Sequence, residues 1–145
     1  MFTFSKILNA CLPHRLHDAV RSLHHMQLHI IDCGFSVTSY TIESLSGVEV
    51  FPEEIKYGND AISLGAIKRL LAGYYIVSVG IRNTGPKFEE KFLYIVQKDE
   101  EHFICIEKVR SQYYIFDPVC GLYKENLENV LNYKLSEVML KVTKN

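Results

Sequence analysis

The sequence predicts an α+β fold, in which a helical N-terminal half packs on an antiparallel β-sheet formed by the C-terminal half. Two observations predict this division. Apolar residues recur at helical spacing before Gly73, whereas β-branched and aromatic runs dominate after it. The length of 145 residues, 48% of them hydrophobic, indicates one domain covering residues 1–145. Residues 1–24 are expected to form an N-terminal extension or helix.

The first helices follow from apolar spacing and from helix-terminating residues. Residues 34–45 carry apolar or small side chains at positions typical of a largely buried helix that begins at about Cys33. Gly47 is expected to end that helix. Pro52, followed by two glutamates, suits the first turn of a short helix that ends by Gly58.

The remaining elements follow from a capping residue and from β-favouring composition. Ser63 can cap the next helix, which is expected to end with Gly73 at its C′ position. The β-favouring runs that follow are 74–81, 92–97, 102–109, 112–116 and 136–142. Residues 109–112 join two of these runs so tightly that an antiparallel hairpin is expected. Residues 126–131 are expected to form a short helix before the last strand.

Composition excludes several classes of function. Sixteen Lys and Arg residues against seventeen Asp and Glu residues give a net charge of −1, so nucleic acid is not an expected partner. No apolar run approaches the roughly 20 residues of a membrane-crossing helix. The first 14 residues lack the features of a secretory signal, which favours a cytosolic location. The four cysteines form no C-x-x-C pair and are expected to be free thiols.

Four residues together supply the parts of a cysteine hydrolase: Gln27, Cys33, His102 and Asp117. Cys33 is expected at a helix N-terminus, where the helix dipole lowers the pKa of a thiol. His102 begins one strand of the expected hairpin and Asp117 closes the other, which can bring base and orienting carboxylate together. Gln27 suits an oxyanion donor. Each residue alone also has an ordinary structural explanation, so the prediction depends on their combination.

These residues lie in motifs that resemble those of the C39 peptidases, which cleave double-glycine leaders at the N-termini of peptide-exporting ABC transporters. That family shows a Gln six positions before a Cys-Gly pair, usually preceded by Asp, and residues 27–34 read Gln-Leu-His-Ile-Ile-Asp-Cys-Gly. It later shows His-Phe/Tyr-apolar, a short hairpin and Asp-Pro-x-x-Gly. Residues 102–104 and 117–121 reproduce this pattern. The resemblance extends over nearly the whole chain.

The resemblance implies a papain-like cysteine peptidase fold. It implies that Cys33 is the nucleophile, His102 the general base and acid, and Asp117 the residue that orients the imidazole. Gln27 and the Cys33 backbone N–H would form the oxyanion hole. The implied substrate is a precursor peptide cut after Gly-Gly, and the implied partners are the transmembrane and nucleotide-binding domains of an ABC exporter at the inner face of the cell membrane. No cofactor and no metal is implied.

The chain departs from the family pattern directly after Cys33-Gly34, where residues 35–38 are bulkier than the small residues usual there. The alternative function is therefore a weakly active or inactive domain that docks the transporter's cargo. A third possibility directs the same machinery at a side-chain amide or isopeptide bond. His14 and His17 have metal-ligand spacing, but no Cys or carboxylate cluster accompanies them. Cys105 and Cys120 are expected to be structural.

Overall fold

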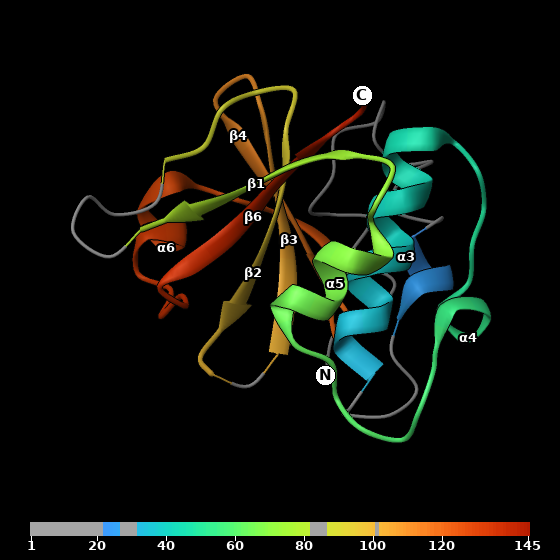
Figure 1. Ribbon diagram of the computed structural model, residues 1–145. Coiled ribbons are helices and arrows are strands. Elements are labelled where there is room, and N and C mark those ends of the chain that lie inside the picture. Colours follow the sequence, from blue (N-terminus) through green and yellow to red (C-terminus); the bar gives the residue numbers. More distant parts are fainter. Residues whose placement is uncertain (1–21, 27–31, 82–86, 101) are drawn as a thin grey trace.

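The computed structural model describes residues 22–26, 32–81, 87–100 and 102–145 of the chain (Figure 1). These residues form helices and a six-stranded antiparallel sheet, so the α+β class is confirmed. Most of the predicted N-terminal extension, residues 1–24, lies outside the described residues. No helix in the described part of the chain is both long and apolar enough to cross a membrane.

The sheet has the strand order β1-β6-β2-β3-β4-β5, with every neighbouring pair antiparallel. Its strands are β1 (Tyr75–Gly80), β2 (Leu93–Lys98), β3 (His102–Val109), β4 (Gln112–Asp117), β5 (Gly121–Glu125) and β6 (Val138–Thr143). The β3–β4 hairpin is confirmed, with Val109 paired to Gln112 and Arg110 at a positive φ of 59° in the turn. Strand β5 was not predicted, and it pairs with β4 directly after the turn that follows Asp117.

The helical elements are η2 (Ser22–His25), α3 (Cys33–Ser46), α4 (Pro52–Ile55), α5 (Leu64–Leu70) and α6 (Leu127–Leu131). Helix α3 begins at Cys33 as predicted and ends at Gly47, whose φ of 74° places it in the left-handed conformation. Ser63 caps α5 by accepting a hydrogen bond from the Ala66 N–H. The prediction that Gly73 provides the C′ position is wrong, because α5 already ends at Leu70 and Leu71 is its C-cap.

Helix α3 is buried on almost every side, although its sequence is rich in Ser and Thr. The hydroxyls of Thr38 and Thr41 donate to the carbonyls of Gly34 and Val37, one turn earlier, at 2.7 Å each. These bonds satisfy polar groups that would otherwise be costly to bury. These two side chains can therefore lie in the core without facing water.

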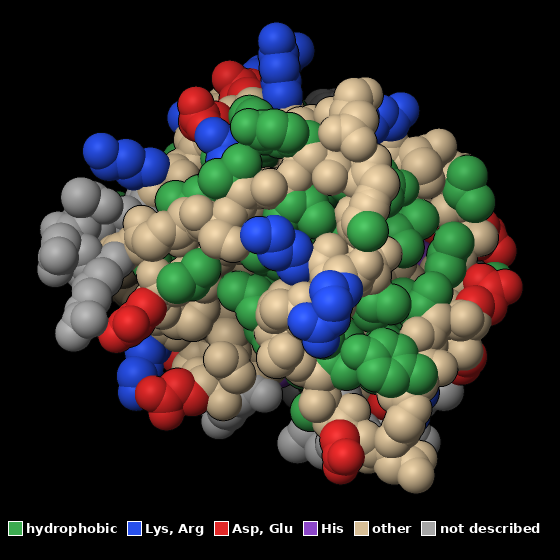
Figure 2. Space-filling view, in the orientation of Figure 1, with side chains coloured by type: hydrophobic (Ala, Val, Ile, Leu, Met, Phe, Trp, Pro, Cys, Tyr) green, Lys and Arg blue, Asp and Glu red, His purple; other side chains and the backbone are tan. Residues whose placement is uncertain are grey.

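The two faces of the sheet have separate cores. On one face, α3 and α5 pack against alternate residues of the central strands, including Phe103 and Cys105 of β3. On the other face, α6 contributes Val130 to a cluster with Ile104 and Ile106, the intervening residues of β3. Edge strand β1 is largely exposed, and Figure 2 shows hydrophobic side chains across this side of the molecule with Lys and Arg side chains between them.

An aromatic stack fixes α3 on the sheet. The rings of Tyr40 and Phe116 are parallel within 1° and 4.2 Å apart. The ring of His25 meets both edge-on. The His25 ring nitrogens lie 2.8 Å from the Ser39 hydroxyl and from the Glu43 carboxylate. This buried group joins η2, α3 and β4, the elements that flank the residues considered below.

Replacement of Phe116 tests the contribution of this stack. Phe116 is fully buried, so Phe116→Ala should lower the free energy of unfolding by about 3–5 kcal/mol. Urea unfolding monitored by circular dichroism measures the change. Val119→Ala is the matched control, because Val119 is 50% exposed and its truncation should have little effect. Equal losses in the two variants would contradict this assignment of the core.

Candidate active site

Cys33 is the first residue of α3, at the end of the helix that faces the start of β3. The preceding residue, Asp32, is buried and makes no side-chain cap on the helix. Its carboxylate instead lies 2.8 Å from the Lys56 ammonium group, which follows α4. This ion pair ties the start of α3 to the segment after α4 and so helps to fix the position of Cys33.

Cys33 is 5% exposed, and backbone groups surround its thiol. The backbone N–H groups of Phe103, Gly34 and Cys33 itself are directed toward the sulfur and favour its ionised form. Burial outweighs them and raises the pKa of the Cys33 thiol above its ordinary value. The expectation of a lowered thiol pKa is therefore wrong, because removal of the sulfur from water has a larger effect than the helix terminus. At neutral pH the resting group is a thiol.

His102 and Asp117 are brought together by the β3–β4 pairing. His102 Nε2 lies 2.8 Å from Asp117 Oδ2. The second carboxylate oxygen, Oδ1, accepts hydrogen bonds from the backbone N–H groups of Val119 at 2.8 Å and Cys120 at 3.4 Å. Asp117 is 3% exposed, so each of its oxygens has a donor in place of water.

The hydrogen bonds of Asp117 decide its charge. Burial acts to raise the pKa of this carboxyl, but His102 and the N–H groups of Val119 and Cys120 outweigh burial, and the pKa is lowered. An ionised Asp117 accepts the hydrogen on His102 Nε2 and therefore favours the imidazole tautomer whose lone pair is on Nδ1. The pair thus has the arrangement of an imidazole oriented by a carboxylate.

The thiol and the His102–Asp117 pair both lie near the start of β3. The N–H directed at the Cys33 sulfur belongs to Phe103, the residue next to His102 in the chain. The Asp117 charge is also close enough to disfavour ionisation of the thiol. Gln27, the fourth predicted site residue, lies outside the described residues.

Cys33 opens into a pocket of about 400 Å³. Its lining residues are Cys33, Ala61, Ile62, Ser63, Leu64, Gln97, Phe103, Ser136, Glu137 and Val138. Ser63 was predicted as a helix cap and Phe103 as part of the His102 motif, but apart from Cys33 the sequence did not predict that any of these residues line a pocket. They come from the α4–α5 connection, β2, β3 and the segment entering β6, so their meeting depends on the tertiary fold. Strand alternation and helical spacing describe single elements, so they cannot predict which residues of different elements line a common pocket.

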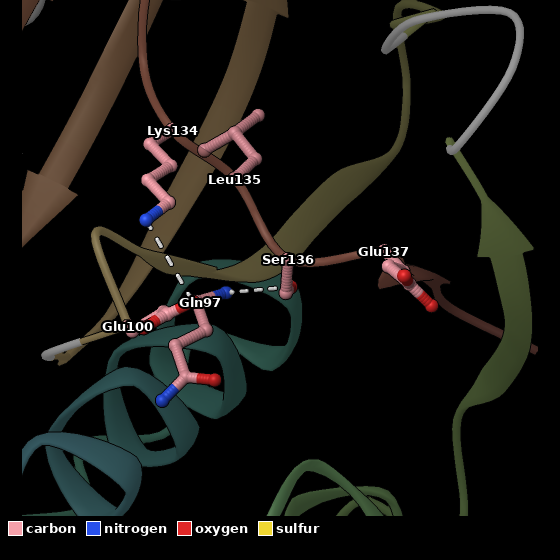
Figure 3. Close-up of a pocket in the computed structure, with 6 residues that line it drawn as sticks. All are labelled: Gln97, Glu100, Lys134, Leu135, Ser136 and Glu137. Atoms are coloured by element: carbon pink, nitrogen blue, oxygen red, sulfur yellow. Dashed lines mark hydrogen bonds and ion pairs between the residues drawn. The ribbon is translucent and has the colours of Figure 1, made fainter.

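Within the described part of the chain, two further pockets share lining residues with this one. A pocket of about 340 Å³ shares Gln97, Ser136 and Glu137, and Figure 3 shows it near the end of β2. There the Gln97 N–H donates to the Ser136 hydroxyl at 3.3 Å. A pocket of about 360 Å³ on the other side shares the residues Ala61, Ile62 and Ser63. The three pockets are adjacent to one another, and Cys33 lines the middle one.

The other cysteines have different surroundings. Cys105 is 2% exposed in the core, where its sulfur lies 3.7 Å from the Thr41 hydroxyl, and burial raises the pKa of its thiol. Cys120 is partly exposed in the turn after Asp117. Among the described residues, no three His, Cys, Asp or Glu side chains form a group that could hold a metal ion. His14 and His17 lie outside the described residues.

Comparison with known proteins finds a likeness in structure but none in sequence. No family model matches the chain, and no curated protein matches its sequence. A solved structure, a double glycine motif protease from an AMS/PCAT transporter in complex with the leader peptide, matches with a TM-score of 0.66 at 17% identity. The match covers 82% of this chain and 89% of the other. At this identity the comparison shows that the two chains share a fold.

The lowered pKa of Asp117 predicts how stability depends on pH. The folded-state pKa lies below the unfolded value of about 3.9, so the stabilisation is fully present above that pH and is lost as pH falls through the folded pKa. The free energy of unfolding of the parent should therefore fall more steeply on acidification than that of Asp117→Asn. Urea unfolding at a series of pH values measures both curves, and parallel curves would contradict the assignment.

The raised pKa of Cys33 predicts the pH dependence of its reactivity. Because the thiolate is the reactive form, the rate of Cys33 alkylation by iodoacetamide should keep rising above pH 9.0, the ordinary thiol value. Peptide mapping by mass spectrometry measures the rate at Cys33 and, as an internal reference, at the partly exposed Cys120. A rate at Cys33 that levels off below neutral pH would show instead a thiolate stabilised by the helix terminus.

Proposed function

We propose that this chain is a cysteine peptidase of papain-like fold that cuts precursor peptides after a Gly-Gly motif. The observation that carries the proposal is the placement of the Cys33 thiol, at a helix start, against the residue next to a hydrogen-bonded His102–Asp117 pair. Thiol, base and orienting carboxylate are the parts that acyl transfer requires. The shared fold with a double glycine motif protease supports the proposed peptidase function.

In the proposed reaction, His102 Nδ1 takes the proton of the Cys33 thiol as the sulfur attacks the scissile carbonyl carbon. Asp117 remains ionised and stabilises the imidazolium that forms. The imidazolium then gives its proton to the leaving amine, and the peptide bond breaks to leave a thioester on Cys33. Water, deprotonated by His102, then attacks the thioester carbonyl and the C–S bond breaks. The leader leaves as a carboxylate, and Cys33 takes back the proton from the His102 imidazolium.

The Gln27 side chain and the Cys33 backbone N–H are proposed as the donors to the oxyanion. Their contribution would be to the charge that appears on the carbonyl oxygen only in the transition state. The adjoining hollows on either side of Cys33 would receive the peptide on both sides of the scissile bond. The proposed setting is the cytoplasmic side of a membrane, with the transmembrane and nucleotide-binding domains of an ABC exporter as partners.

Residues 35–38, the bulky departure from the family pattern, do not narrow the pocket. Phe35 and Val37 are fully buried, as are Ser36 and Thr38, and none of the four lines the pocket that Cys33 opens into. Phe35 packs edge-on against Tyr57, with ring centroids 5.3 Å apart. The bulky side chains at the start of α3 therefore pack in the protein interior and not in the pocket.

One observation favours the alternative, a domain that docks cargo without cutting it. The Cys33 thiol is 5% exposed and its pKa is raised, so the nucleophile at rest is both covered and protonated. A docking module would need neither an accessible thiol nor an oriented imidazole. The two functions therefore differ in what a substitution at the His102–Asp117 pair should do.

A cleavage assay with a precursor whose leader ends in Gly-Gly separates these functions. Cys33→Ala should abolish cleavage, and Asp117→Asn should lower kcat by about 10²-fold or more, while both retain leader binding measured by titration calorimetry. Cys120→Ser is the matched control, because it removes a second thiol near Asp117 and should leave kcat unchanged. If the reduced parent binds several such precursors and cuts none, the docking function is correct.

Replacement of Gln27 tests the proposed oxyanion donor. Gln27→Ala should lower kcat by about 10²–10³-fold with little change in KM, because the lost hydrogen bond acts in the transition state. Steady-state kinetics on the same precursor measures both constants. Gln97→Ala, at a pocket-lining glutamine, is the comparison variant and should act mainly on KM. A Gln27→Ala enzyme with kcat within about twofold of the parent, far below the loss of an oxyanion donor, would remove Gln27 from the site.

A further inference from the structure

Ile62 lies directly on the backbone next to the nucleophile. A Cβ placed on Gly34 would come within 2.5 Å of Ile62 Cγ1 and 3.1 Å of Ile62 Cδ1. The Ile62 side chain thus occupies the space that any larger residue at position 34 would need. Ile62 also lines both the pocket that contains Cys33 and the adjoining pocket along the α4–α5 connection.

The segment that carries Ile62 has few other anchors to the core. Residues 57–61 are exposed and Ser63 is exposed, whereas Ile62 is partly buried and packs against the core cluster that includes Cys33. Ile67, on the following helix, also approaches Gly34, but it is fully buried and fixed in that core. Of these two side chains, Ile62 is the one that can be changed without removing a central core residue.

We propose that Ile62 is the specificity-determining residue that limits the size of the group able to reach the Cys33 thiol. This inference rests on the proposed function and deepens it, because it assigns the size limit to one side chain. Cys33 is 5% exposed, and among the described residues this pocket gives an acyl group a route to the sulfur. Ile62 and Phe103 both line that pocket, and both lie close to the start of α3.

The consequence concerns the residue that provides the scissile carbonyl. A residue without a Cβ can bring its carbonyl to the sulfur past Ile62, whereas a branched side chain would have to displace it. Ile is stiff at χ1, so it can move aside less readily than an unbranched residue of similar size. Shortening Ile62 should therefore widen the range of groups accepted, and should do so for chemical reagents as well as for peptides.

The test compares two thiol reagents of different size on the full chain. Iodoacetamide is small and N-phenylmaleimide carries an aromatic ring, and peptide mapping gives the rate of each at Cys33. Ile62→Ala should raise the N-phenylmaleimide rate relative to the iodoacetamide rate by about tenfold or more, since even one methylene in a hydrophobic pocket changes discrimination by about 10–200-fold. Leu70→Ala is the control, because Leu70 lies on α5 and lines none of the three pockets, and it should leave this ratio unchanged.

A second Ile62 variant and a second precursor complete the test. Ile62→Val removes one methyl group and keeps a β-branched side chain, so it should shift the ratio in the same direction by a smaller factor while remaining folded by circular dichroism. A precursor with Ala as the last leader residue should be cut poorly by the parent and relatively better by Ile62→Ala. A reagent ratio that does not change in either Ile62 variant, or that changes equally in Leu70→Ala, would overturn the inference. A changed ratio without any peptide cleavage would support the inference on access and overturn the proposed function.

Discussion

The site depends on the packing of the first turn of α3 against the start of β3. It places the Cys33 sulfur against the Phe103 N–H, and thereby beside the strand residue that carries the imidazole. Two interactions hold this contact, one at the start of α3 and one at its middle. The Tyr40–Phe116 stack fixes the middle of α3 on β4, and the Asp32–Lys56 ion pair fixes its start.

Strand register is the second constraint. Cys105 pairs with Phe116, and this register brings the start of β3 beside the end of β4, where His102 and Asp117 meet at 2.8 Å. Because side chains alternate across a sheet, a slip of one residue would turn Asp117 to the opposite face. The turn that follows contributes as well, since its N–H groups hold the second carboxylate oxygen and favour the ionised form. One residue thus ends a strand, organises a turn and orients the imidazole.

Much of this could be predicted from the sequence because the signals were local. The bounds of β3, the start of α3 at Cys33 and the cap at Ser63 follow from periodicity and capping chemistry. Strand β5 was missed because its five residues follow a tight turn, and its pairing with β4 depends on that turn rather than on its own composition. The pKa of Cys33 was wrongly expected to be low because a helix start can be read from a sequence, whereas the depth at which it is buried cannot. The pocket walls were missed for the same reason, since Ile62 meets Gly34 only in the folded chain.

The proposed function requires that Cys33 is the nucleophile toward a peptide carbonyl that enters through this pocket. The most direct measurement is covalent capture with a leader peptide that ends in a Gly-Gly chloromethyl ketone, read by intact mass and then by peptide mapping. One adduct per chain is expected, on Cys33, and it should form much more slowly when the free leader peptide competes. Adducts on Cys120 at a comparable rate, or no adduct under reducing conditions, would contradict it.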